Sequence, residues 1–275
     1  MIHRQLRFGG GLVLAVVAAL TVGMTIGCGP DTTNYIAIGD SIAEGRGATD
    51  QETLDYVGLF NDFYETDHDG PERLTTYEQD GETSCSVIAN QVVKAAAVIR
   101  DDETDVGVVT VTIGGNDFLP LTTEEPCASS PTGGECRTIV AIAMTNFSVN
   151  FPAVRNDLKT ALDSDPGDEQ LLVTTYYNPY RGTGSPFELV TDGILFGPDG
   201  TIDCAANATD FTKGGLNDMI TCFAAAAGAT ADDLYPVITE RALTHTHIAT
   251  GGIHPNDEGY KLIVGAVIMA YKAGK

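Results

Sequence analysis

The fold is decided by the stretch Tyr35-Ile36-Ala37-Ile38-Gly39-Asp40-Ser41. Its first four residues form an apolar run that predicts a buried strand. The glycine, the aspartate and the serine that follow predict a turn at the carboxyl end of this strand, and that edge of an open α/β sheet is where ligands bind. We expect a helix to begin after Ser41, so that the Ser41 backbone N–H faces any developing negative charge. Ser41 is therefore the first candidate nucleophile.

Composition sets the class of protein. The chain has 275 residues, of which 43% are hydrophobic and 19% are charged, and this length is enough for one α/β domain with a full core. Its formal net charge of −23 argues against nucleic acid as a partner, because no basic face is available to neutralise phosphates. The same charge argues against docking on anionic lipid.

The first 27 residues are predicted to be a secretory signal peptide. His3, Arg4 and Arg7 make a basic start, and a mainly apolar stretch over 12–22 follows. The ending Met24-Thr25-Ile26-Gly27-Cys28 resembles a bacterial lipoprotein cleavage box, with Cys28 as the residue that takes the lipid. Residues 28–33 then form a tether. Plain secretion and a retained membrane span are the alternatives, and all three place the domain outside the cytoplasm, free or anchored to the bacterial cell envelope.

The cysteines agree with an oxidising compartment. We favour the pairs Cys127 with Cys136 and Cys204 with Cys222, because each closes a short loop in a stretch rich in Gly, Pro, Thr and Ser. Cys85 is then expected to be a buried free thiol. Other connectivities stay open, because spacing does not fix the pairing.

Apolar strands alternate with amphipathic helices along the chain, which predicts a parallel sheet of about five strands with helices on both faces. The expected strands are 35–38, 74–78, 106–113, 171–177 and an edge strand within 229–234. The expected helices are 52–66, 84–100, 214–227, a C-terminal helix opened by 254–260, and one or two helices over 137–164 with a break near Pro152. Loops over 118–136 and 181–212 are expected to run over the surface.

Four polar positions are predicted to meet at one edge of this sheet. Ser41, Gly81 and Asn116 follow successive strands, and His254 comes from the C-terminal segment. A serine hydroxyl needs a neighbouring base to become a good nucleophile, and imidazole titrates in the right range. Backbone N–H groups and a side-chain amide can stabilise the oxyanion that forms when an ester carbonyl is attacked. A glycine suits such a position because it lets its N–H approach closely.

These four positions resemble the ordered blocks of the SGNH hydrolases, the GDSL lipase and esterase family. The matches are Ser41 in Gly-Asp-Ser, Gly81 in Gly-Glu-Thr-Ser, Asn116 in Gly-Gly-Asn-Asp and His254 in His-Pro-Asn. The resemblance implies a three-layer flavodoxin-like fold over residues 34–275, with a site that uses neither metal nor cofactor.

In this resemblance Ser41 and His254 are catalytic, and Ser41, Gly81 and Asn116 form the oxyanion hole. Asp40 supports the turn and Asp117 holds its loop. The implied substrate is an ester of a small molecule, a lipid or an acylated carbohydrate. We expect a monomer that touches a membrane only through its N-terminal lipid.

One position departs from the family pattern. Gly251 stands where family members usually carry an aspartate three residues before the histidine. Three readings follow: a backbone carbonyl near Gly251 or Gly252 orients His254 in a Ser–His dyad, a remote acid replaces the aspartate, or the enzyme is slow or inactive. The remote acids considered are Asp232, Asp233 and Asp257.

Two rival functions follow from the same residues. The site could transfer acyl groups to a carbohydrate hydroxyl instead of water, or the domain could be a surface binding module with a weakened relay. His245 and His247 flank Thr246 without a third ligand at suitable spacing, so we predict no metal site there.

Overall fold

The computed structural model describes residues 33–68, 72–101, 104–122, 124–130, 133–164, 167–197, 204 and 214–275. The predicted signal peptide, Cys28 and most of the tether lie outside the described residues. Five strands form one sheet in the order β2-β1-β3-β4-β5, and every pairing between neighbours is parallel. The expected α/β fold with a parallel sheet is therefore confirmed.

The strands are β1 (Thr33–Gly39), β2 (Glu72–Thr76), β3 (Asp105–Thr112), β4 (Gln170–Thr174) and β5 (Thr230–Asp232). The longer helices are α1 (Tyr56–His68), α2 (Val93–Ile99), α4 (Gly134–Leu162), α5 (Phe187–Phe196), α7 (Leu216–Ala226) and α10 (Asp257–Ala273). The short helices are α3 (Gly115–Phe118), α8 (Tyr235–Ile238) and α9 (Ala242–His245). Single turns complete the list: a π-helical turn η1 (Ile88–Val92) and 3-10 turns η2 (Leu119–Thr122), η3 (Thr239–Arg241) and η4 (Ile248–Thr250).

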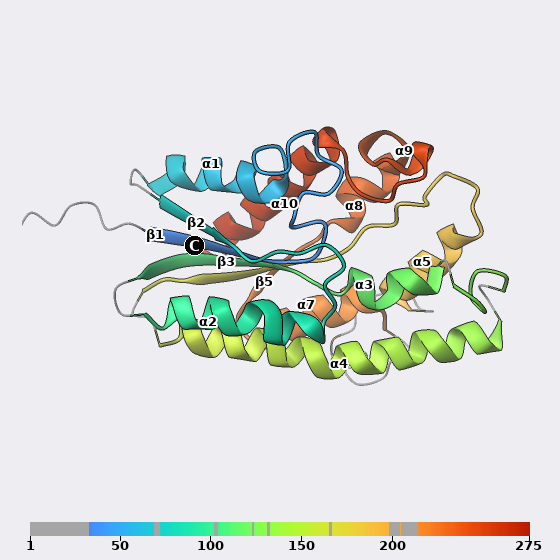
Figure 1. The fold of residues 1–275 in the computed structure, drawn as a ribbon, viewed down its shortest axis with the longest axis horizontal. Helices are drawn as coiled ribbons and strands as arrows, with labels where there is room; N and C mark the ends of the chain where they lie inside the picture. The colour runs from blue at the N-terminus through green and yellow to red at the C-terminus, as the bar shows by residue number, and fades with distance from the viewer. Residues whose placement is uncertain are drawn as a thin grey trace, which may run out of the picture.

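The helices form two layers around the sheet (Figure 1). Helices α1 and α10 cover one face, and α2, α4 and α7 cover the other. On the first face Phe60 of α1 meets Tyr271 of α10 edge to face, with ring centroids 5.7 Å apart. On the second face Phe147 and Phe151 of α4 stack at 5.0 Å. These rings are fully or almost fully buried, so the core lies on both sides of β1, β3 and β4.

The turn after β1 differs from our prediction. No helix begins at Ser41; residues 41–47 form successive turns and α1 begins at Tyr56. Gly45 and Gly47 both have positive φ, which a regular helix does not allow. Asp55 then caps α1 by accepting a hydrogen bond from the Gly58 N–H at 2.6 Å, which explains why the helix starts later than expected.

Two further predictions were wrong. Helix α4 is continuous over Gly134–Leu162 with Pro152 inside it, because Phe151, Val154 and Leu158 remain buried on one stripe that packing holds in place. Cys85 is a free cysteine but it is exposed, since Ser84 beside it is the residue that turns inward. The two favoured disulfides, Cys127–Cys136 and Cys204–Cys222, are both present.

The end of β4 also comes earlier than expected. Its ladder to β3 stops by Val173, and the Tyr176 N–H donates to the Asn217 side chain instead. The chain after Thr174 is thereby directed away from the sheet and over its carboxyl edge. Within the part of the chain that the structure describes, no helix is both long and apolar enough to cross a membrane.

The end of β1 gives a stability prediction. A Cβ on Gly39 would lie 2.4 Å from the Thr112 carbonyl oxygen, so Gly39→Ala forces β1 and β3 apart. We expect a loss of about 1–3 kcal/mol in the free energy of unfolding, measured by urea denaturation. Gly265→Ala is the matched control, because a Cβ there meets nothing within 4 Å and alanine is the better helix former, giving a gain of about 0.5–1 kcal/mol. Equal midpoints for Gly39→Ala and the wild type would contradict this account of the β1–β3 contact.

Candidate active site

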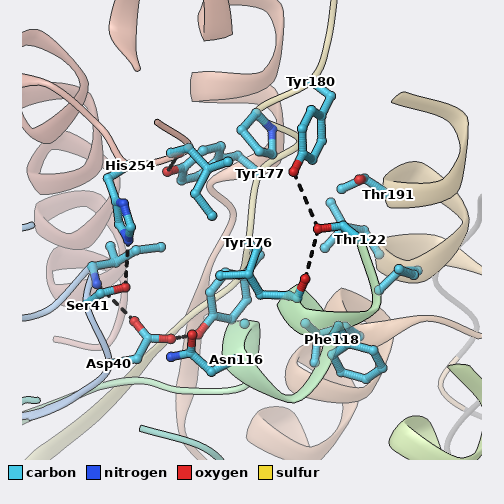
Figure 2. A pocket seen from close by; sticks show the side chains of 18 residues that line it. Asp40, Ser41, Asn116, Phe118, Thr122, Tyr176, Tyr177, Tyr180, Thr191 and His254 are labelled. Atoms are coloured by element: carbon cyan, nitrogen blue, oxygen red, sulfur yellow. Dashed lines mark hydrogen bonds between the residues drawn. The ribbon is translucent and has the colours of Figure 1, made fainter. Parts of the chain in front are cut away.

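The structure brings Ser41 and His254 together. His254 Nε2 lies 2.8 Å from Ser41 Oγ, although the two residues are 213 positions apart in the chain. Ser41 leaves the carboxyl end of β1, and His254 lies in the segment between η4 and α10, so both stand over the same edge of the sheet (Figure 2). The hydroxyl and the imidazole are therefore in hydrogen-bonding contact before any substrate is present.

Residues 46–49 dock onto the segment that carries His254. The Tyr260 hydroxyl donates to the Arg46 carbonyl at 2.9 Å, and His247 Nε2 lies 2.8 Å from the Gly47 carbonyl oxygen. The backbone N–H and the hydroxyl of Thr49 donate to the two oxygens of the Asp257 carboxylate, at 2.7 and 2.8 Å. We call these contacts the clasp. A Cβ on Gly47 would lie 2.4 Å from the Pro255 carbonyl oxygen, so the two segments approach too closely for any other residue there.

The His254 segment is also held from its other side. Tyr177, just after β4, donates its hydroxyl to the Ile253 carbonyl at 2.8 Å. The His247 N–H donates to the His254 carbonyl at 2.9 Å, and Thr246 forms an antiparallel bridge with Pro255. The backbone on both sides of the imidazole is thus fixed by two further segments, the chain after β4 and residues 246–247.

Asp40 fixes the turn that carries Ser41. Its Oδ1 accepts the Ile42 N–H at 3.0 Å, and its Oδ2 accepts the Tyr176 hydroxyl at 2.5 Å. Burial raises the pKa of Asp40 to about 7, although these two hydrogen bonds act to lower it. Asp40 therefore joins the end of β1 to the end of β4 and points away from His254 (Figure 2).

Three hydrogen-bond donors near the Ser41 turn each have an N–H that bonds to no acceptor among the described residues. Asn116 uses one amide proton to donate to the Glu82 carbonyl at 2.9 Å, which places the Gly81 loop against Asn116. The backbone N–H groups of Ser41 and Gly81 donate to no acceptor among the described residues. Gly81 has φ +80°, is exposed, and does not line the cavity that Ser41 and Asn116 share.

Asp117 holds the loop that carries Gly81. Its two carboxylate oxygens accept the Ser84 N–H and the Ser84 hydroxyl, at 2.9 and 2.6 Å. Asn150 of α4 donates to the same hydroxyl at 3.2 Å. Burial raises the pKa of Asp117.

A buried amide that our sequence reasoning missed completes this support. Gln91 accepts the Gly39 N–H at 2.7 Å and donates to the Gly39 carbonyl at 2.9 Å. It also donates to the Glu82 carboxylate at 3.0 Å, so it joins the end of β1 to the Gly81 loop. The signal was present, because Val87, Gln91 and Ala95 are spaced four apart within the predicted helix 84–100 and all three are buried, and a buried polar side chain needs a partner.

The imidazole of His254 is neutral over most of the pH range. Burial lowers its pKa to about 4, and the nearby Arg46 and His247 act in the same direction. With Nε2 accepting from Ser41, Nδ1 carries the ring proton, and no described residue accepts a hydrogen bond from it. Neither a backbone carbonyl at Gly251 or Gly252 nor a carboxylate is placed at this atom within the described chain.

None of the three remote acids bonds to His254 among the described residues. Asp257 is part of the clasp, and Asp233 Oδ1 caps the turn at Tyr235. Asp232 is 4% exposed at the end of β5, where burial raises its pKa and neither carboxylate oxygen has a partner among the described residues. His245 and His247 bond Thr244 and Gly47, and no metal-binding group of His, Cys, Asp and Glu occurs within the described residues.

A cavity of about 100 Å³ opens beside Ser41 and His254. By the same measure one water needs roughly 10–15 Å³, so the cavity can take a group of several non-hydrogen atoms. Its apolar walls come from the Ser41 turn, α3, η2, α5 and α7, and include Ile42, Phe118, Leu119, Ile194, Leu195 and Leu216. The expected loop over 181–212 thus contributes a helix, α5, to the wall; residues 198–203 and 205–213 lie outside the described part.

A hydroxyl in contact with a neutral imidazole, beside spare N–H donors and an apolar cavity, is the arrangement of a serine hydrolase. The model of the GDSL-like lipase/acylhydrolase family matches residues 37–262. The chain belongs to this family and is a carboxylic ester hydrolase. No curated protein matches the sequence.

Solved structures share the fold. A lipase from a goat rumen metagenome superimposes with a TM-score of 0.61 at 17% identity, over 87% of this chain and 97% of that one. An extracellular lipase from Streptomyces rimosus gives 0.57 at 21% identity, over 87% and 100%. An acetylxylan esterase from Geobacillus stearothermophilus gives 0.56 at 12% identity, over 88% and 95%. At these identities the likeness concerns the fold.

Proposed function

We propose that this chain hydrolyses carboxylic esters through an acyl-enzyme on Ser41, with His254 as the base. The 2.8 Å contact between Ser41 Oγ and His254 Nε2 carries this proposal. As Ser41 Oγ bonds to the ester carbonyl carbon, its proton passes to His254 Nε2. Collapse of the tetrahedral intermediate breaks the bond to the alkoxide, which takes that proton. Water then repeats the two steps and releases the acid.

The oxyanion is assigned to the three spare donors. The Ser41 N–H, the Gly81 N–H and the second amide proton of Asn116 are free of acceptors among the described residues. Donors that are fixed before the reaction need no reorganisation when charge develops. The Glu82 carbonyl, Asp117 and Gln91 hold these donors in place through the contacts described above.

The substrate's apolar portion is assigned to the cavity next to Ser41. Its walls are mainly aliphatic and aromatic, so burial of an apolar chain there is favourable by roughly 25 cal/mol per Å². A neutral imidazole without a carboxylate partner gives a dyad. It accepts the serine proton at neutral pH, but its charged form is poorly stabilised, so we expect a lower kcat than an acid-supported triad would reach.

The assignment of roles is tested on a short 4-nitrophenyl ester. Ser41→Ala is expected to abolish turnover and to keep the fold, as judged by circular dichroism. Asn116→Ala is expected to lower kcat about 100-fold with a small change in KM, because its hydrogen bond forms mainly in the transition state. Wild-type turnover in Ser41→Ala would rule out the nucleophile, and a change confined to KM in Asn116→Ala would rule out its oxyanion role.

The missing acid gives a prediction on pH dependence. Because the pKa of His254 is lowered to about 4, kcat/KM of the wild type is expected to hold from pH 7 to pH 5 and to halve near pH 4. Gly251→Asp restores a carboxylate at the position where family members usually carry an aspartate; Gly251 has φ +91°, and a Cβ there meets nothing within 4 Å. An anion at Nδ1 favours the imidazolium, so the acidic limb is expected to move to higher pH and kcat to rise.

Gly251→Asn is the control for this substitution, because it brings similar bulk and the same backbone demand without charge. The dyad would be contradicted if the acidic limb of the pH profile of kcat/KM moved equally in both variants. It would also be contradicted if the wild type lost activity with a pKa near 6.5.

We also propose that the enzyme acts outside the cytoplasm, anchored through a lipid on Cys28. The basic and apolar leader and the two disulfides support this address. In a bacterial host, Cys28→Ser is expected to move the protein from the membrane fraction to the soluble fraction and to abolish incorporation of labelled palmitate. Membrane association that survives Cys28→Ser would contradict the lipid anchor.

A further inference from the structure

One side of the cavity is polar. Hydroxyl groups of Thr122, Tyr180 and Thr191 belong to its lining, whereas most other lining side chains are apolar. They come from η2, from the chain after β4 and from α5. Figure 2 shows all three in the part of the pocket that lies away from Ser41 and His254.

The Thr191 hydroxyl lacks the partner that a helical threonine usually finds. Three other helical threonines of this chain donate to the carbonyl four residues earlier: Thr66 at 3.0 Å, Thr138 at 2.9 Å and Thr145 at 2.8 Å. Thr191 is only 9% exposed, and its Oγ1 is buried without a hydrogen-bond partner among the described residues. Leaving a buried hydroxyl unpaired costs about 1–3 kcal/mol, so a partner that arrives with a ligand would be favoured.

The donors and acceptors at this side define what the partner must be. Thr122 Oγ1 donates to the Leu119 carbonyl at 2.8 Å, so the Tyr180 hydroxyl, 3.5 Å away, is the donor toward Thr122. The Tyr180 oxygen therefore keeps lone pairs to accept a hydrogen bond, and Thr191 keeps its proton to donate one. A group that both donates and accepts satisfies both residues, and a hydroxyl is the simplest such group.

Charge excludes the main competitor. The described lining of this cavity includes no lysine or arginine, and the buried Asp40 belongs to it. A carboxylate or a phosphate on the substrate would be buried beside Asp40 with no cation to pair with, so an anionic group is disfavoured here.

We propose that Thr191 and Tyr180 form a subsite for a hydroxyl group carried by the ester substrate. This inference rests on the proposed function, because the subsite is reached from the carbonyl held at Ser41. The hydroxyl stands on the portion of the ester that enters the cavity, which is either its acyl chain or its alcohol.

Two pairs of esters distinguish these sources. The acyl pair is 4-nitrophenyl 6-hydroxyhexanoate against 4-nitrophenyl hexanoate, and the alcohol pair is 4-hydroxybutyl acetate against butyl acetate. The readout is the ratio of kcat/KM within each pair. Thr191→Val removes the hydroxyl at nearly constant shape and is expected to lower this ratio about 3- to 10-fold in one pair.

Thr145→Val is the matched control, because it makes the same change on the exposed side of α4 and should leave both ratios as in the wild type. Ratios that are unchanged in Thr191→Val for both pairs would overturn the subsite. An equal fall for both members of each pair would overturn it as well, because that is the effect of a structural role.

Binding separates this proposal from the catalytic one. In the Ser41→Ala background, calorimetry is expected to show that Thr191→Val weakens binding of the hydroxylated ester by a similar factor while the unsubstituted ester binds as before. That result with no turnover in the wild type would refute the hydrolase assignment and keep the subsite. Turnover in the wild type with no selective effect of Thr191→Val on binding would refute the subsite and keep the hydrolase assignment.

Discussion

The candidate site depends on the docking of residues 46–49 onto the C-terminal segment. Ser41 and His254 lie far apart in the sequence, and neither a covalent crosslink nor a shared helix or strand fixes the distance between them. The clasp does so through the Arg46 and Gly47 carbonyls and through the paired bonds from Thr49 to Asp257. Because Gly47 has φ +99° and almost no free space around its Cα, the approach is set by backbone against backbone. The 2.8 Å contact between Ser41 and His254 is the consequence.

This construction explains how a histidine can be oriented without an acid. In a Ser–His–Asp arrangement the carboxylate both points the imidazole and stabilises its charged form. Here the pointing is taken over by backbone contacts: Ile253 is held by Tyr177, and the His254 carbonyl is held by the His247 N–H. The stabilisation of charge is not replaced, so nothing offsets the burial that lowers the pKa of His254. The site keeps its geometry and gives up part of its electrostatic support.

The parallel sheet, and the meeting of Ser41 with His254 at its edge, could be predicted from the sequence. The β-branched run of β3 and the apolar run of β1 are strong local signals, and parallel strands necessarily bring their following loops to one edge. The turn after Ser41 could not be predicted, because its shape follows from contacts with Asp55 and with residues some two hundred positions later. The continuity of α4 through Pro152 is another tertiary effect, since the local signal favours a break.

The cavity was the least predictable part of the site. Its walls come from the Ser41 turn, η2, the chain after β4, α5 and α7, and each contributes only one to a few side chains. No sequence motif marks the side chains that line the cavity. From the sequence alone, Thr191 is therefore indistinguishable from any other threonine in a helix. The structure shows what the sequence does not: the Thr191 hydroxyl is buried without a partner among the described residues, whereas the Thr145 hydroxyl bonds to the carbonyl four residues earlier.

The most direct test of the account is covalent labelling of the folded protein with a fluorophosphonate at neutral pH, followed by peptide mapping. The account predicts one adduct, on the Ser41 hydroxyl, formed rapidly in the wild type and at least 100-fold more slowly in His254→Ala, because the imidazole in contact with that hydroxyl activates it. An unlabelled Ser41, or a labelling rate that does not depend on His254, would contradict it.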